Sequence, residues 1–548
     1  MNDTCKHTSS VSAARRLSRS GTLFAAAAVA AWTALFAPPA FAQIQQGALI
    51  TIADGQVQGH LNGTTREFLG LPYAAPPTGT LRWRPPTPVM PWNGVLDAVS
   101  YSNSCPQTAA LIGVPSENED CLYLNVWTPD PAPAEPRPVM VWIHGGANVA
   151  GSTGDLVPFP PYESYHFYDA HNLVATRDVV VVSMNYRLGV FGFFGHSDLA
   201  AEDSEFPYAG NQGLLDQRAA FQWVHDNIAA FGGDPNKVTI FGESAGSFDV
   251  CAHVVSPLSR GLFHRAISES GGCTAGIATM EQSAAQAASI STAVGCAPAP
   301  DELACLRAVP VADLLSAFQF SESELAITGL GISVDGGFLP DHPRSLIEAE
   351  NFAHVPYILG ANSDEGSLFF IGSTPITTPA EYTAALVNRY GSIAPQVELM
   401  YPVGKFKSPQ AALIRVSGDA SLVCSTYDTA SRLAAKKNRT YVYNFARVPP
   451  LPFVNLLDLG AFHGAEISYA LGSLPPPSGF DAMLAGWMQE YWTRFAEKGV
   501  PKAKKASGWP RFNPKSYKML RLNTGLTKVK GFRKAECEFW SSVYDQIN

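Results

Sequence analysis

The sequence predicts an α/β protein in which a central, mostly parallel sheet carries helices on both faces. Short runs of β-branched residues alternate with a helical stretch, and 46% of the 548 residues are hydrophobic, which is enough for a large core. No linker interrupts the chain after residue 43. We therefore expect one domain over residues 43–548, with large insertions between its elements.

Five short apolar runs have the length and composition of buried strands. They comprise residues 139–143, 179–185, 238–241, 357–360 and 440–445. A helical stretch over residues 214–231 lies between the second run and the third. Strands that alternate with helices in this way pair in parallel through crossover connections, and this order is the basis of the predicted sheet.

Residues 1–42 have the features of a cleaved export signal. A basic start around Arg15 precedes an apolar stretch over residues 23–36, and Ala40-Phe41-Ala42 fits the small-x-small pattern of signal peptidase sites. The apolar stretch is too short to cross about 30 Å of hydrocarbon, so we expect no stable membrane anchor. The mature chain would begin at Gln43 and be secreted or periplasmic.

The charge and the cysteines narrow the class of function. The net charge of −9 argues against nucleic acid or anionic membranes as partners. Cys5 leaves with the signal, and the other eight cysteines are candidate disulfides whose pairing cannot be read from spacing. No CxxC or Cys/His zinc pattern occurs, so we expect no metal and no cofactor. The oligomeric state stays open.

A candidate nucleophile follows the third strand directly, in Gly242-Glu243-Ser244-Ala245-Gly246. The GxSxG pattern is weak alone, but between a strand and a helix it is typical of a nucleophile elbow. The glycines allow a tight turn that places the serine hydroxyl at a helix N-terminus, where the helix dipole favours developing negative charge. Ser244 is therefore the predicted nucleophile.

A pair of glycines follows the first strand, in His144-Gly145-Gly146-Ala147. Alone, this pattern is most often an ordinary turn. Upstream of a nucleophile elbow it favours an oxyanion hole, because small residues let the backbone approach a substrate and bind its oxyanion through N–H groups.

The general base is expected among the histidines after Ser244, because in this arrangement the chain order is serine, acid, histidine. Three histidines lie in the later part of the chain, after residue 300. His342 lies in a proline-flanked loop, His354 just precedes a strand, and His463 lies in a glycine-flanked loop late in the chain. Position favours His463 as the base.

These motifs resemble those of the type-B carboxylesterase/lipase family, which includes the cholinesterases. Residues 68–77 resemble the family's N-terminal block, residues 119–126 its second signature, and residues 231–246 its active-site signature. The resemblance covers nearly the whole mature chain. It implies an α/β-hydrolase fold and a carboxylic ester hydrolase that works through an acyl-enzyme on Ser244.

The resemblance also implies the other catalytic residues. The block over residues 362–366 resembles the one whose glutamate completes the triad, which assigns this role to Glu365, whereas the residues alone do not distinguish it from Asp364. The expected oxyanion donors, by the same comparison, are the N–H groups of Gly146, Ala147 and Ala245.

Disulfides and ion pairs follow from the same comparison. The implied disulfides are Cys105–Cys121, Cys296–Cys305 and Cys424–Cys537. Cys251 and Cys273 are left over, either paired or free. The implied structural ion pairs are Arg82 with Glu119 and Arg187 with Asp216.

The chain departs from the family pattern in three places. The loop over residues 106–120 lacks the tryptophan with which cholinesterases hold a quaternary cation, so we do not expect choline specificity. Asn148 stands where the family usually has an aromatic residue, and Asp249 where it usually has a serine. We expect Asp249 either to hydrogen-bond Glu365 as a second carboxylate, or to point to solvent or a backbone N–H.

The expected substrate is a small or medium exogenous ester. Two other functions stay open at this stage. One is a lipase that acts on long-chain acylglycerols, although no amphipathic lid is evident. The other is a non-catalytic binding protein on the same fold, which is disfavoured because serine, glutamate and histidine all stand in their matching blocks.

Overall fold

A computed structural model of the protein describes residues 45–108, 112–157, 165–318, 331–474 and 479–547. Residue contacts divide the chain into two units, Met1–Gln45 and Gln46–Asn548. All elements described below belong to the second unit, apart from the first residue of its first strand. The predicted export signal, residues 1–42, lies outside the described residues.

A 13-stranded mixed sheet forms the centre of this unit. Its middle is a run of parallel strands, which lie in the spatial order β7 (Val180–Met184), β6 (Arg137–Ile143), β8 (Gly233–Glu243), β9 (Arg265–Glu269), β12 (Tyr357–Asn362), β13 (Thr440–Phe445) and β14 (Lys518–Leu522). The five predicted strands are β6, β7, β8, β12 and β13. The mostly parallel sheet that the sequence predicts is therefore confirmed.

Antiparallel strands complete the two edges of the sheet. β2 (Gly55–Asn62), β3 (Thr65–Pro72) and β5 (Tyr123–Pro129) continue it beyond β7, and β15 (Thr527–Lys530) pairs with β14. The outer strands at the first edge are β1 (Gln45–Ile52) and β4 (Val95–Asp97), and β4 pairs with β2 in parallel. A separate parallel pair joins β10 (Ala278–Thr279) to β11 (Ser333–Val334).

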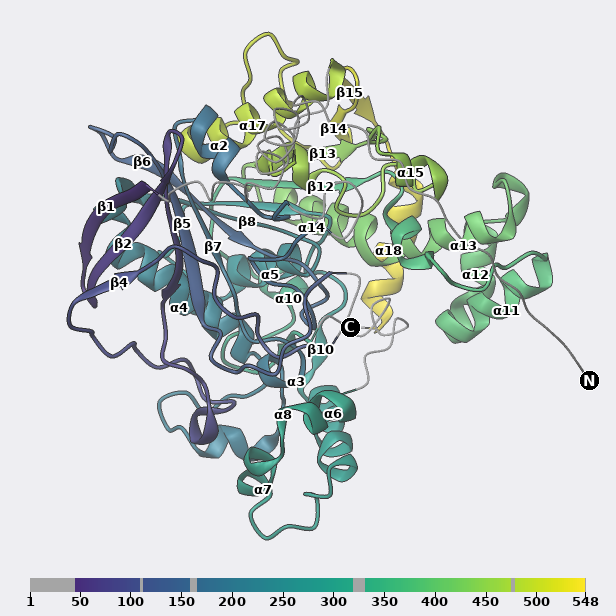
Figure 1. Ribbon diagram of the computed structural model, residues 1–548. Helices are drawn as coiled ribbons and strands as arrows, with labels where there is room; N and C mark the ends of the chain where they lie inside the picture. Colours follow the sequence, from purple (N-terminus) through teal and green to yellow (C-terminus); the bar gives the residue numbers. More distant parts are fainter. Residues whose placement is uncertain (1–44, 109–111, 158–164, 319–330, 475–478, 548) are drawn as a thin grey trace, which may run out of the picture. The chain divides into compact units, whose positions relative to one another are not determined.

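Alternation along the strands divides the core between two faces. In β6, Val139 and Val141 belong to one hydrophobic cluster, and Met140 and Trp142 belong to the other. The helices of the first face are α4 (Gln212–Asn227), α5 (Ala245–Val255), α10 (Pro343–Glu348), α14 (Cys424–Ala435) and α18 (Lys534–Ile547). Those of the second are α2 (His171–Thr176), α16 (Ile467–Leu471) and α17 (Phe480–Lys498). Figure 1 shows α2 and α17 above the sheet and α4 and α5 below it.

Further helices are inserted between the strands, as the sequence predicts. Between β9 and β12 lie α6 (Met280–Ala293), α7 (Glu302–Ala308) and α8 (Val311–Ala317), which pack around Trp83 in a small third cluster. Between β12 and β13 lie α11 (Pro379–Tyr390), α12 (Ala394–Met400) and α13 (Pro409–Gly418). Two short helices are α3 (Gly189–Gly192) and α15 (Pro452–Leu456).

Four disulfides cross-link the chain. They are Cys105–Cys121, Cys251–Cys273, Cys296–Cys305 and Cys424–Cys537. Three have the partners that the family resemblance implies, and the two leftover cysteines also pair. Disulfides form and persist in oxidising compartments, so the four bridges indicate an extracellular or secretory location.

The two ion pairs implied by the resemblance are also formed. Arg82 lies 2.6 Å from Glu119, and Arg187 lies 2.7 Å from Asp216. Asp216 is fully buried on α4 and accepts two bonds from the Arg187 guanidinium, which fixes the segment after β7 against this helix. None of the helices in the described residues is sufficiently long and apolar to span a membrane.

Candidate active site

Ser244 lies in a strained turn between β8 and α5. Its backbone has φ 57° and ψ −126°, and its N–H donates to the Glu269 carbonyl oxygen at 2.9 Å. A Cβ at Gly242 or Gly246 would come within 2.6 Å and 2.2 Å of the Ile143 carbonyl oxygen, so only glycine fits where the turn crosses the end of β6. Ser244 is partly exposed, while all of α5 after it is buried.

The loop after β6 approaches this turn closely. A Cβ at Gly145 would lie 3.0 Å from the Ser244 Cβ. Gly146, Ala147 and Asn148 follow with positive φ values of 110°, 56° and 57°, so the loop turns sharply here. Among the described residues, the N–H groups of Gly146 and Ala147 donate to no backbone carbonyl. These two N–H groups and the N–H at the start of α5 are the candidate oxyanion donors.

His463 and Glu365 meet beside the turn. Glu365 follows β12, and its Oε2 lies 2.7 Å from His463 Nδ1, while its Oε1 accepts a bond from the Asn362 N–H at 2.6 Å. The neighbouring Asp364 instead accepts bonds from Arg415 and from a backbone N–H. The geometry thus separates two acids that the residues alone do not distinguish.

The other two candidate histidines lie elsewhere. His342 caps α10 by accepting a bond from the Arg344 N–H, and His354 packs on Phe352. In the described residues Ser244 makes no hydrogen bond to His463, whose Nε2 lies 3.3 Å from Glu243 Oε1. Catalytic hydrogen bonds are often long without substrate and tighten in its complex.

Three further buried carboxyl groups surround His463 or the turn, and sequence reasoning missed them: Glu243, Glu269 and Glu466. Burial raises the pKa of Glu243 to about 8 despite the attraction of His463, and burial with the nearby Glu365 raises the pKa of Glu466 to about 7. Burial lowers the pKa of His463, but Glu243, Glu365 and Glu466 outweigh it and raise that pKa to about 9. The site therefore strongly favours a positive charge on the imidazole.

A sequence signal for two of these groups exists. Glu243 directly precedes the serine, and Glu466 follows His463 by three residues, so both must lie near the reacting groups. Glu466 accepts bonds from Ser270 at 3.0 Å and from the Asn362 side chain, which in turn is next to the Glu365 loop. In the described parts of the chain, no group of three or more His, Cys, Asp or Glu residues could hold a metal ion.

Asp249 does not form the expected hydrogen bond with Glu365. Its carboxylate accepts bonds from Asn148 Nδ2 at 3.0 Å and from Gln217 Nε2 at 2.6 Å, and it is fully buried, so it does not point to solvent either. The reason is the helix period. Ser247 faces Gly271, on the side of β9 and β12, and a residue two positions later lies about 200° further around the helix. Asp249 therefore faces α4 and the loop after β6.

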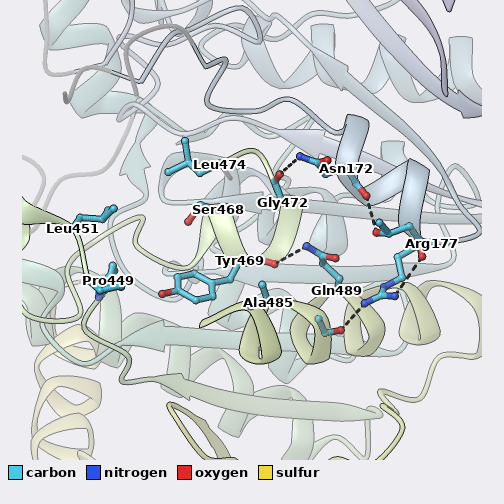
Figure 2. Close-up of a pocket in the computed structure, with 14 residues that line it drawn as sticks. Asn172, Arg177, Pro449, Leu451, Ser468, Tyr469, Gly472, Leu474, Ala485 and Gln489 are labelled. Atoms are coloured by element: carbon cyan, nitrogen blue, oxygen red, sulfur yellow. Dashed lines mark hydrogen bonds between the residues drawn. The ribbon is translucent and has the colours of Figure 1, made fainter. Parts of the chain in front are cut away.

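A separate cavity of about 290 Å³ lies among α2, α16 and α17. Arg177 donates to the Gly486 carbonyl at 2.8 Å, and Asn172 donates to the Gly472 carbonyl at 2.8 Å. Figure 2 shows the bond between Asn172 and Gly472. None of the predicted catalytic residues lines this cavity, so it is not the candidate active site.

The sequence matches the model of the carboxylesterase family over residues 46–540. It is 34% identical to a cholinesterase of Mus musculus over 546 residues, which covers 91% of this chain and 87% of the relative. It is also 34% identical to an acetylcholinesterase of Bungarus fasciatus over 539 residues, which covers 89% of this chain and 84% of the relative. The resemblance seen in the sequence motifs is confirmed, and so is the fold that it implies. The chain belongs to the carboxylesterase family and is a serine hydrolase that acts on carboxylic esters.

Proposed function

We propose that the protein hydrolyses esters through a covalent acyl-enzyme on Ser244, with His463 as the base and Glu365 as the acid that orients it. The observation that carries the proposal is the 2.7 Å contact between Glu365 and His463, which lie next to a serine in a strained strand-to-helix turn. This combination of a nucleophile, a base and an orienting acid is the arrangement that activates a hydroxyl.

The reaction would proceed in two halves. Ser244 Oγ attacks the ester carbonyl while His463 Nε2 takes its proton, and the N–H groups of Gly146, Ala147 and Ala245 bind the resulting oxyanion. The C–O bond to the alcohol then breaks, and the alcohol leaves with the proton from His463. Water repeats these steps on the acyl-enzyme and releases the carboxylic acid.

The position of Glu365 supports this role for His463. The imidazole becomes positively charged when it takes the serine proton, and the Glu365 carboxylate, 2.7 Å from Nδ1, stabilises that state in a site with little water. Because Glu365 is already in place, the stabilisation requires no rearrangement as charge develops.

We further propose that the natural substrate is a small or medium exogenous ester, met outside the cytoplasm after cleavage of the export signal near Ala42. The four disulfides support an exported protein. The loop over residues 106–120, which carries no tryptophan, supports a substrate other than choline esters.

The test is Ser244→Ala, with Ser247→Ala as the matched control, because Ser247 is buried on the same turn of α5 and faces away from the oxyanion loop. We expect Ser244→Ala to lose roughly 10⁶-fold in kcat and all labelling by a fluorophosphonate, while the control keeps both. Near-normal turnover in Ser244→Ala would contradict the proposal. Faster hydrolysis of emulsified long-chain esters than of short soluble ones would contradict the substrate class.

A further inference from the structure

Asn148 Nδ2 donates a hydrogen bond to Asp249 Oδ1 at 3.0 Å, although the two residues lie 101 positions apart in the sequence. Both side chains are fully buried. Asn148 directly follows Ala147 in the oxyanion loop, and Asp249 lies on the helix that Ser244 begins. Their contact therefore joins the oxyanion loop to the helix of the nucleophile.

Asp249 is the acceptor at the end of a directional network. Ser259 donates to His253 Nδ1 at 2.8 Å, His253 Nε2 to Gln217 Oε1 at 2.9 Å, and Gln217 Nε2 to Asp249 Oδ2 at 2.6 Å. Burial lowers the pKa of His253 to about 3, so this ring is neutral and carries a single N–H. Asp249 has no cationic partner among the described residues, which leaves these amide donors as its stabilisation.

The network ends on a strained segment. Ala147 and Asn148 have φ values of 56° and 57°, a region that residues other than glycine seldom adopt and that asparagine tolerates better than most. The Asn148 carbonyl accepts a bond from the Gly189 N–H at 2.6 Å, and its Oδ1 accepts one from Tyr186 at 3.0 Å. With Asp249 as the third contact, Asn148 is fixed through both its backbone and its side chain.

We propose that Asp249 is a positioning residue for the oxyanion hole: its carboxylate holds Asn148, and Asn148 holds the Gly146 and Ala147 N–H groups in the strained conformation that points them at the substrate. The inference rests on the proposed function of Ser244, because it assigns a role to a residue that touches neither the substrate nor the triad. It also gives Asp249 a partner other than Glu365.

The proposal has a kinetic signature. Oxyanion contacts strengthen in the transition state, so loss of their alignment lowers kcat and leaves KM almost unchanged. Removal of one oxyanion donor outright costs roughly 10²–10³-fold in kcat. Loosening of the loop that carries two donors should cost somewhat less, about 10–100-fold, because the donors remain present but misaligned.

The experiment compares Asp249→Ala, Asp249→Asn and the control Ser247→Ala in kcat and KM for a short soluble ester, normalised to fluorophosphonate-titrated sites. We expect Asp249→Ala to lose about 10–100-fold in kcat with KM within about 2-fold, and Ser247→Ala to lose nothing. We expect Asp249→Asn to recover within about 3-fold of wild type, because an amide oxygen still accepts from Asn148 and neutral His253 can change tautomer to suit a flipped Gln217.

A double-variant cycle tests whether Asp249 acts through Asn148. If it does, adding Asp249→Ala to Asn148→Ala lowers kcat little further, so the double variant has about the kcat of Asn148→Ala alone. Provided that Ser244 still reacts with the fluorophosphonate, three results would overturn the inference: additive losses of kcat in the double variant, a normal kcat in Asp249→Ala, or an effect confined to KM. Failure of Ser244 to react with fluorophosphonate would instead overturn the proposed function. Should Asp249→Ala not fold, Asn148→Ala carries the same expected kcat loss.

Discussion

The disulfide between Cys424 and Cys537 allows a quantitative prediction. It joins the start of α14 to α18 across a sequence separation of 113 residues, and both sulfurs are buried. A cross-link restricts the unfolded chain in proportion to the logarithm of the loop that it closes, which for this loop gives about 4.8 kcal/mol at 25 °C. In the folded state α18 stays anchored by other contacts, such as Trp540 Nε1 donating to the Tyr401 hydroxyl at 3.0 Å. Cys424→Ala/Cys537→Ala should therefore fold but unfold more easily.

The matched control is Cys296→Ala/Cys305→Ala, which also removes one bridge but closes a loop of only 9 residues. The same relation gives about 2.6 kcal/mol for this bridge, so the two variants should differ by about 2 kcal/mol. The assay is urea unfolding followed by fluorescence, after non-reducing peptide mapping of the parent has recovered both bridges. Equal losses in the two variants, or a larger loss in the control, would refute the loop-length reasoning.

Two other predictions concern buried charge. Glu243→Gln removes the carboxyl group that does most to raise the pKa of His463 to about 9. The acidic limb of kcat/KM, which rises as His463 loses its proton, should therefore move to lower pH. An acidic limb at an unchanged pH would contradict this prediction. Asp216→Ala leaves the Arg187 guanidinium buried without its carboxylate and should cost about 3–5 kcal/mol in urea unfolding. Lys407→Ala, in a pair exposed on both sides, should instead change stability by less than about 0.5 kcal/mol. A loss below about 1 kcal/mol for Asp216→Ala would contradict the second prediction.

Local sequence patterns predicted the parts of the site that local chemistry determines. The strand over residues 238–241 and the glycines around Ser244 require only near neighbours in the chain, because the turn and its helix follow one another directly. His463 could be chosen by position and chain order alone. Glu365 could not, since its distinction from Asp364 lies in which carboxylate reaches His463. The family resemblance supplied that choice, and Glu365 is the acid whose carboxylate lies 2.7 Å from His463.

The electrostatic surroundings of His463 could be predicted only in part. Glu243 and Glu466 lie within three residues of proposed catalytic residues in the sequence, yet this proximity does not reveal burial, and burial is the main cause that raises their pKa. Glu269 has no such signal. It comes to the site because β9 pairs with β8 in parallel, with Glu243 and Glu269 as register partners at the ends of these strands. Strand pairing, which the sequence predicted only as a class, thus decides which carboxyl groups share the site.

The contact between Asn148 and Asp249, the two departures from the family pattern, also could not be predicted from the sequence. In the sequence each is an isolated change, and the serine that the family usually has at position 249 directed attention to Glu365. The period of α5 instead turns Asp249 toward α4 and the loop after β6, where Asn148 and Gln217 supply two amide donors for one buried carboxylate. A buried carboxylate is costly unless such donors are present, and a buried asparagine amide is costly without an acceptor. Each of the two residues therefore lowers the cost of burying the other. This mutual requirement explains why the chain departs from the family pattern at both Asn148 and Asp249, which are hydrogen-bonded to each other.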